Sequence, residues 1–187
     1  MPTDKDFLPL LTPGLPGWRM AGAGGFLEVG PGTVESRGGP GLFWFADAVF
    51  ADFVLVAEWR CQGDHDNSGI FLRSPPLADS DKPAIEQGYE IQIDDRGVAP
   101  DGSLGSPLHL TGAVYSLVPV TESAFRPTGD WNRFEVKARG GDIGVVLNGR
   151  PVCHLTGGNR RREGHVALQA HHDGSRVQFR DLRVARL

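Results

Sequence analysis

The sequence has few cysteines, no excess of basic charge and no long apolar run. Its 187 residues include 2 Cys, too few for a disulfide framework or a four-Cys metal site. The formal net charge of -4 argues against a nucleic-acid partner. No apolar segment approaches the ~20 residues that a membrane-spanning helix needs. The acidic start, with Pro9 and Pro13, does not read as a signal peptide. We therefore expect a cytoplasmic protein, or a periplasmic or secreted one if the N-terminus has been trimmed.

Helical periodicity and several catalytic motifs are also missing. No long segment free of Gly and Pro places apolar residues at i, i+3, i+4 and i+7. The phosphate-binding Gly-rich loop, the zinc motif His-Glu-x-x-His and the nucleophile motif Gly-x-Ser-x-Gly do not occur. The length predicts a single domain over residues 1–187, with a core at about 18–187 and an N-terminal arm at 1–17.

Short apolar segments bounded by turn residues run along the chain, in keeping with its 26 Gly and 14 Pro. This spacing predicts an all-β protein, an antiparallel sandwich or barrel. The clearest turn is Asn148-Gly149, which predicts a tight type I′ hairpin. The predicted strands are Phe26–Val29, Gly41–Phe45, Ala51–Cys61, Gly69–Arg73, Gly88–Asp94, Ala113–Leu117, Trp131–Ala138, Asp142–Leu147, Pro151–Leu155, His165–His171 and Arg176–Ala185.

Alternation within the predicted strands separates two kinds of polar face. In the segment 89–94, the side chains on one face are Glu90, Gln92 and Asp94. In the segment 166–171, Gln169 and His171 likewise lie on the same face of their strand. These side chains can hydrogen-bond neighbouring sugar hydroxyls, although a polar structural network would have the same composition. By contrast, the segment 131–139 has a charged face of Arg, Glu and Lys that is typical of plain surface.

Eight motifs, in order along the chain, resemble the 3-keto-disaccharide hydrolase domain family. The resemblance covers roughly residues 18–187. The motifs are Trp18, Phe50–Arg60, Asp66–Arg73, Gly88–Asp95, Thr111–Leu117, Gly129–Gly140, Val146–Val152 and Gly164–Val184.

The resemblance implies an antiparallel jelly-roll β-sandwich of the concanavalin A-like lectin and glucanase type. It also implies a hydrolase or lyase acting on 3-keto-glycosides, with an oxidised disaccharide or glycoside as its partner. Because such a sandwich can host lectins as well as enzymes, a non-catalytic carbohydrate-binding module is the alternative. The loop Pro75–Glu86 departs from the family pattern, which leaves its part in substrate choice open.

A C3 carbonyl makes the C2 proton acidic, so such an enzyme needs a base, an acid and a group that stabilises the oxyanion. We expect His171 or Glu90 to be the base. Glu58 is the other candidate carboxylate, and we expect it to pair with Arg73, either to steady the oxyanion or as a structural device. The residues expected to bind substrate hydroxyls or stack on the sugar are Gln92, Asp94, Gln169 and Tyr115.

No cofactor is predicted, although a divalent metal such as calcium is compatible with this chemistry. Asp64, Asp66 and Asn67 carry suitable oxygens, but their spacing favours an Asx-rich turn over a calcium loop. Cys61 and Cys153 are expected to be free thiols. Asn67, Trp131 and Asn132 match family motifs and are interpreted as scaffold. The oligomeric state is left open.

Overall fold

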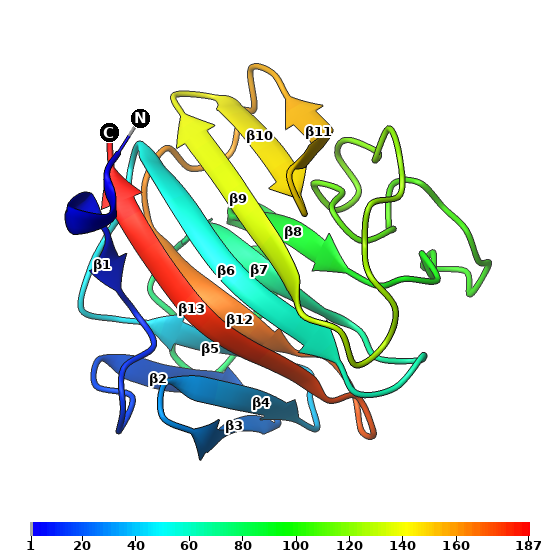
Figure 1. Cartoon of the computed structure of the whole chain (residues 1–187), viewed down its shortest axis with the longest axis horizontal. Helices are drawn as coiled ribbons and strands as arrows, with labels where there is room; N and C mark the ends of the chain where they lie inside the picture. The colour runs from blue at the N-terminus through cyan, green and yellow to red at the C-terminus, as the bar shows by residue number, and fades with distance from the viewer. Residues whose placement is uncertain (1) are drawn as a thin grey trace.

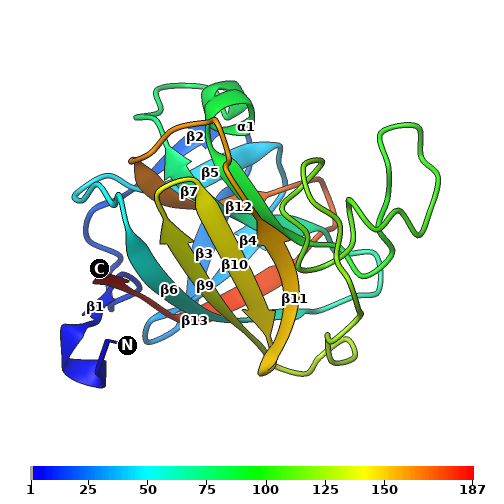
Figure 2. The ribbon, with the colours of Figure 1, turned by 90° about the horizontal axis from the view of Figure 1, so that it is seen from above.

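The computed structural model describes residues 2–187, which form two antiparallel β-sheets packed face to face (Figures 1 and 2). The large sheet has eight strands in the order β11-β10-β9-β6-β13-β4-β3, with β1 beside β13. The small sheet has five strands in the order β2-β5-β12-β7-β8. Neighbouring strands come from distant parts of the chain, as in β6 beside β13 and β5 beside β12. The predicted all-β antiparallel sandwich is therefore confirmed.

The strands of the large sheet are β1 (Leu8–Pro9), β3 (Gly25–Gly30), β4 (Thr33–Arg37), β6 (Phe53–Cys61), β9 (Asn132–Arg139), β10 (Asp142–Leu147), β11 (Arg150–Leu155) and β13 (Val177–Arg186). Those of the small sheet are β2 (Trp18–Gly22), β5 (Gly41–Phe45), β7 (Ser68–Ser74), β8 (Tyr89–Ile93) and β12 (His165–Ala170). The helices are a 3-10 turn at Asp4–Asp6 and α1 (Lys82–Gln87). Among residues 2–187, neither is long and apolar enough to cross a membrane.

The main core lies between the two sheets. Alternate residues of each strand point into it, so Leu55, Ala57 and Trp59 of β6 face Ile91 and Ile93 of β8 within one buried cluster. Cys61 and Cys153 lie in this cluster as free thiols, as predicted. Because the period of a strand is two, the residues between these core positions lie on the outer faces of the sandwich.

A second, smaller apolar cluster lies on the outer face of the small sheet. Helix α1 covers this face near β7 and β8, and Figure 2 shows it on the side away from the large sheet. Ala84 of α1 is fully buried there with Phe71 of β7 and Ala167 of β12. The helix therefore stands beside the outward-facing side chains of β7, β8 and β12 and forms a wall next to them.

Most predicted strands are confirmed to within a residue or two, including β5 and β10 with their full bounds. One predicted strand, Ala113–Leu117, is wrong. Gly112 and Ser116 have positive φ of 97° and 56°, and the segment forms turns with isolated bridges at Val114. Strands β2 and β4 and helix α1 were not predicted, because their segments carry too many Gly, Pro or polar residues for a clear pattern.

Candidate functional site

A pocket of about 460 Å³ opens on the outer face of the small sheet, next to α1. Its volume lies within the range of ordinary small-molecule sites, about 300–1,000 Å³. Polar side chains from β8, β12 and their ends form its floor, and loop residues form its rim. The lining residues are Pro40, Asn67, Asp81, Ile85, Glu90, Gln92, Val98, Ala99, Pro100, Tyr115, Gln169 and His171. The structure thus brings together Glu90, Gln92, Tyr115, Gln169 and His171 of the predicted site residues.

Glu90 is the buried carboxyl group of the pocket. It is the second residue of β8, on the face opposite Tyr89 and Ile91, and it is 7% exposed. Within the described residues its carboxylate has no hydrogen-bond donor. Burial raises its pKa to about 8, an effect that the positive charge of Arg160 opposes and the negative charge of Asp81 reinforces. Glu90 is therefore mostly protonated at pH 7 and can donate a proton.

Gly69 makes room for this carboxyl group. It lies on β7 directly beside Gln92, and a Cβ atom there would collide with the Glu90 side chain. The absence of a side chain lets Glu90 lie across the neighbouring strand. A glycine in a central strand otherwise weakens the sheet, so its presence here serves close packing against Glu90.

We expect Gly69→Ala to displace the Glu90 carboxyl group while preserving the fold. Alanine suits a strand at least as well as glycine, whereas a shift of about 1 Å at a reacting group can lower a rate by on the order of 100-fold. Thermal denaturation and steady-state rates on the 3-keto-glycoside that the sequence resemblance implies measure the two effects separately. If Gly69→Ala kept full activity, the position of the Glu90 carboxyl group over Gly69 would not matter for the reaction. Gly25→Ala is the control, because a Cβ atom at Gly25 meets nothing within 4 Å.

His171 directly follows β12 and also faces the pocket. Its Nδ1 lies 2.9 Å from Nδ1 of His172, so one of the two rings donates and the other accepts. Burial lowers the pKa of His171, and the neighbouring His172 lowers it further, against the opposing effect of Asp94. The His171 imidazole is therefore neutral near pH 7 and can accept a proton.

The amides of the floor carry unused acceptors. Gln92 and Gln169 are 2% and 8% exposed, and the Oε1 atom of each is buried without a partner among the described residues. The Nε2 group of Gln92 donates to Asn67 Oδ1 over 3.4 Å, which fixes one end of the amide. Since buried polar groups normally have partners, these oxygens are suited to accept hydrogen bonds from a bound ligand or water.

Asp94 lies beneath the pocket floor and hydrogen-bonds the residues that form it. It is fully buried, and its carboxylate accepts hydrogen bonds from Asn67 Nδ2 (3.1 Å) and from the backbone N–H groups of Arg96 and Val98 (3.0 and 2.9 Å). Asp94 therefore lies beneath the lining residues of the pocket, and its expected contact with substrate stays a prediction. Asp94 positions Asn67, which in turn positions Gln92, and it also holds the start of the loop that carries Val98.

Tyr115 closes one side of the pocket. Its backbone N–H donates to the Glu90 carbonyl over 2.9 Å, and its ring packs against His109 with 4.7 Å between centroids. Burial raises the pKa of its phenol, and the nearby Glu90 raises it further. Tyr115 is thus fixed beside Glu90 as a neutral hydroxyl group, which suits the predicted stacking or hydrogen bonding to a sugar.

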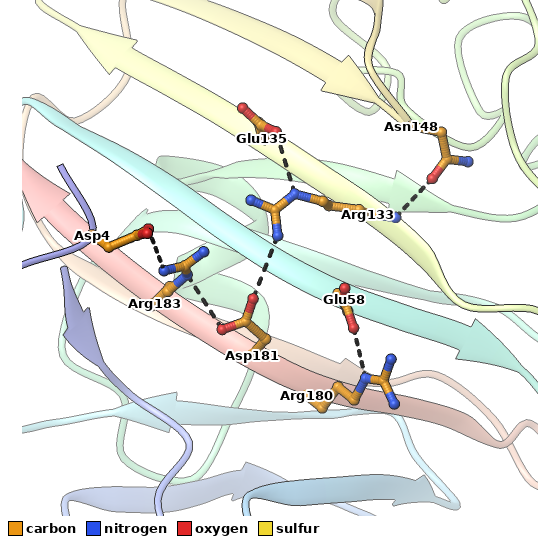
Figure 3. Close-up of polar contacts among 8 residues, drawn as sticks. All are labelled: Asp4, Glu58, Arg133, Glu135, Asn148, Arg180, Asp181 and Arg183. Carbon is orange, nitrogen blue, oxygen red and sulfur yellow. Dashed lines mark hydrogen bonds and ion pairs between the residues drawn. The ribbon is translucent and has the colours of Figure 1, made fainter. Parts of the chain in front are cut away.

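Glu58 is far from this pocket, and the prediction that it pairs with Arg73 is wrong. It lies on β6 of the large sheet, between the core residues Ala57 and Trp59, and therefore points to the outer face of that sheet. Its carboxylate accepts a 2.6 Å hydrogen bond from Arg180 Nε on β13 (Figure 3). Figure 3 shows this pair within a row of partly exposed charges that also contains Arg133, Asp181 and Arg183.

Arg73 is also outside the pocket, so it cannot contact a sugar bound there. It is fully buried at the end of β7 and has a φ of 55°, next to a register shift between β7 and β12. Its guanidinium donates to the carbonyl of Ala51 (2.9 and 2.6 Å), to the carbonyl of Gly140 (2.7 Å) and to Asp52. Arg73 therefore ties together two loops of the large sheet.

Several pocket residues were missed by the sequence analysis. Asn67 was interpreted as scaffold, but it lines the pocket and contacts both Gln92 and Asp94. The rim residues Asp81, Ile85 and Val98 lie in loops or in α1, where no periodic pattern indicates which way a side chain points. The available signal was the position of Asn67, two residues before the predicted strand Gly69–Arg73 and among polar neighbours.

The acidic segment near residues 64–67 forms the predicted Asx-rich turn, in which the backbone N–H of Asp66 donates to the Gly63 carbonyl over 3.2 Å. The Asp66 carboxylate accepts hydrogen bonds from the backbone N–H groups of Gln62 (2.7 Å), Gly63 (2.8 Å) and Arg176 (2.9 Å). Among residues 2–187, no three His, Cys, Asp or Glu side chains form a group that could hold a metal ion. The predicted absence of a cofactor stays a prediction.

Comparisons with known proteins support the fold and assign the family. A family model described as a 3-keto-alpha-glucoside-1,2-lyase-like domain matches residues 12–185. A candidate glycosyl hydrolase from Parabacteroides distasonis has a similar structure, with a TM-score of 0.80 and 20% identity over 100% of this chain and 98% of that one. None of the curated protein sequences matches this chain.

Two further solved structures come from Bacillus subtilis. One is a protein with a galectin-like fold (TM-score 0.68, 14% identity, 96% of this chain and 94% of that one). The other is the carbohydrate-binding module CBM66 (TM-score 0.55, 14% identity, 90% and 91%). These similarities confirm the lectin-type jelly-roll sandwich.

Proposed function

Because this chain belongs to the 3-keto-alpha-glucoside-1,2-lyase-like domain family, we propose that it cleaves 3-keto-glycosides by elimination. The observation that carries the proposal is the pairing of Glu90 and His171 in one pocket. Burial raises the pKa of the first and lowers that of the second, which makes an acid and a base available together near pH 7. The family and the solved structures support carbohydrate processing or binding in general.

The reaction needs one base and one acid. The base takes the C2 proton, and the electron pair of that C–H bond passes to the C3 carbonyl, giving an enediolate. The pair then returns to form the C1–C2 double bond and restore the carbonyl, while the C1–O bond breaks and the acid protonates the leaving oxygen. Water adds to C1 and a proton returns to C2, so the net change is hydrolysis.

We assign the base to His171 and the acid to Glu90. The neutral imidazole of His171 can accept the C2 proton, and the protonated carboxyl group of Glu90 can donate to the leaving oxygen. The buried oxygens of Gln92 and Gln169 would accept hydrogen bonds from sugar hydroxyls. Tyr115 would hold the sugar from the side. No step in this scheme needs a cofactor.

The alternative function is a non-catalytic carbohydrate-binding module. It is favoured by the similarity to CBM66 and by the same unused amide oxygens, which would bind an unreacted sugar equally well. The two functions differ in whether a 3-keto-sugar loses its aglycone.

Incubation with a 3-keto-disaccharide in D2O is the direct test. We expect release of the aglycone sugar and deuterium at C2 of the oxidised product, because the C2 proton passes through the base and returns from solvent. Mass spectrometry and NMR detect both. The unoxidised disaccharide is the control and should stay intact. The same assay with EDTA tests the prediction that no metal is required.

Three outcomes would change this assignment. Cleavage of the unoxidised disaccharide but not of the 3-keto form excludes elimination. Cleavage of the 3-keto form without deuterium at C2 excludes the enediolate. Binding of the sugar without any cleavage identifies the binding module.

A further inference from the structure

The pocket is built of two chemically distinct parts. Its floor carries the carboxyl, amide and imidazole groups described above. Its rim is mostly apolar, and it consists of Pro40, Ile85, Val98, Ala99 and Pro100 together with the carboxylate of Asp81. Ile85 is 41% exposed, and Pro40 and Pro100 are exposed as well. Apolar side chains that remain exposed beside a polar floor offer a surface that a ligand can cover.

The α1 side of the rim is held in place. Arg160 donates through Nη1 to the carbonyls of Ile85 (3.0 Å) and Gly88 (2.8 Å), at the C-terminal half of the helix. The backbone N–H of Arg160 donates to the Tyr89 hydroxyl over 2.8 Å, which fixes Arg160 to β8. Ala84 packs into the second apolar cluster, so its neighbour Ile85 is left at the pocket.

The opposite side of the rim is held by Asp94 and by backbone hydrogen bonds. The backbone N–H of Val98 donates to the Asp94 carboxylate, and that of Ala99 donates to the Ser103 carbonyl over 2.8 Å. The N–H of Gly97 also donates to the Asp94 carbonyl over 3.2 Å. Because both sides are braced before a ligand arrives, little ordering is needed when apolar surface is covered.

We infer that this rim is an aglycone subsite for an uncharged, apolar group attached to C1 of the sugar; the inference rests on the proposed function. A second sugar would need hydroxyl-binding partners, which the floor has and the rim largely lacks. An aromatic or aliphatic aglycone instead covers Ile85, Val98 and Pro100 while its sugar lies on Gln92 and Gln169. The carboxylate of Asp81 disfavours an anionic aglycone by charge repulsion.

Benzyl and methyl 3-keto-glucosides test the subsite, because their leaving alcohols have similar chemistry and differ in apolar area. We expect a KM about tenfold lower for the benzyl compound. Ile85→Asn should raise the KM of the benzyl compound about fivefold and leave that of the methyl compound unchanged. Pro100→Ser is the second variant and should act in the same direction. Leu27→Asn is the matched control and should change neither KM, because Leu27 is an exposed apolar residue on β3 of the other sheet (54% exposed, against 41% for Ile85).

Calorimetric titration with the unoxidised benzyl and methyl glucosides measures binding affinity at the subsite in the absence of turnover. Tighter binding of the benzyl compound, lost in Ile85→Asn, supports it. Equal binding of the two glucosides, or equal losses in Ile85→Asn and Leu27→Asn, overturns the subsite. If neither 3-keto compound releases its alcohol, the proposed reaction is wrong. The titrations still show in that case whether the rim binds an apolar aglycone.

Discussion

Glu90→Gln is expected to lower turnover of a 3-keto-glycoside by on the order of 100- to 10,000-fold, the usual contribution of a general acid. The amide has the size and shape of the carboxyl group but cannot give up a proton at neutral pH. The sugar should still bind, since the oxygens of Gln92 and Gln169 remain. The loss should therefore appear in kcat, with KM changed little.

The same variant is expected to be at least as stable as the wild type. The folded state raises the pKa of Glu90 from its ordinary value of 4.5 to about 8, so the folded protein holds this proton more tightly than the unfolded chain. Its stability therefore decreases as the pH rises from about 4.5 to about 8, and Gln removes this decrease. Denaturation at pH 5 and pH 8 measures the effect. A variant destabilised at both pH values would instead indicate a structural role.

The pH profile of kcat/KM separates the two groups. The rate should rise with pH through a pKa below 6.5, as His171 loses its proton, and fall again near pH 8, as Glu90 ionises. His171→Asn should remove the rising limb and Glu90→Gln the falling one. Glu58→Gln is the matched control, because Glu58 lies on the outer face of the other sheet and should leave the rate unchanged. An equal loss in Glu58→Gln and Glu90→Gln would contradict the site.

Strand periodicity was sufficient to predict which side chains leave the core. Tyr89, Ile91 and Ile93 are buried between the sheets, while Glu90 and Gln92 face the pocket, as their alternation indicates. Periodicity does not indicate which sheet a strand joins. Glu58 has the same in–out pattern as Glu90, but β6 pairs with β13, whose Arg180 lies 122 positions further along the chain.

Alternation also fails to predict the direction of a side chain where the regular pairing of strands ends. Asp94 follows the last residue of β8, and its carboxylate turns back to cap the next loop. Arg73 lies beside a register shift, and its positive φ redirects the side chain into the interior. The rim could not be predicted, because loop residues such as Ile85 and Val98 are placed by contacts with Arg160 and Asp94 rather than by a local pattern.

Arg73→Met is expected to give the opposite result to Glu90→Gln: a loss of about 3 kcal/mol of stability with normal turnover per folded molecule. The guanidinium supplies several charged hydrogen bonds to the Ala51 and Gly140 carbonyls, and Met supplies none of them. Lys would not restore them, since one ammonium group cannot reproduce the planar arrangement of donors. Because Asp52 is 39% exposed at its side chain, the ion pair contributes little beyond these hydrogen bonds.

Chemical denaturation and steady-state rates well below the unfolding transition measure the two effects in Arg73→Met. Arg180→Met is the matched control: its side chain is 43% exposed and its pair with Glu58 lies at the surface, so it should lose less than about 1 kcal/mol. A fall in kcat for Arg73→Met without a loss of stability would mean that Arg73 acts on the reaction after all. Arg73→Met and Glu90→Gln together therefore distinguish a residue that stabilises the fold from a residue that takes part in the proposed reaction.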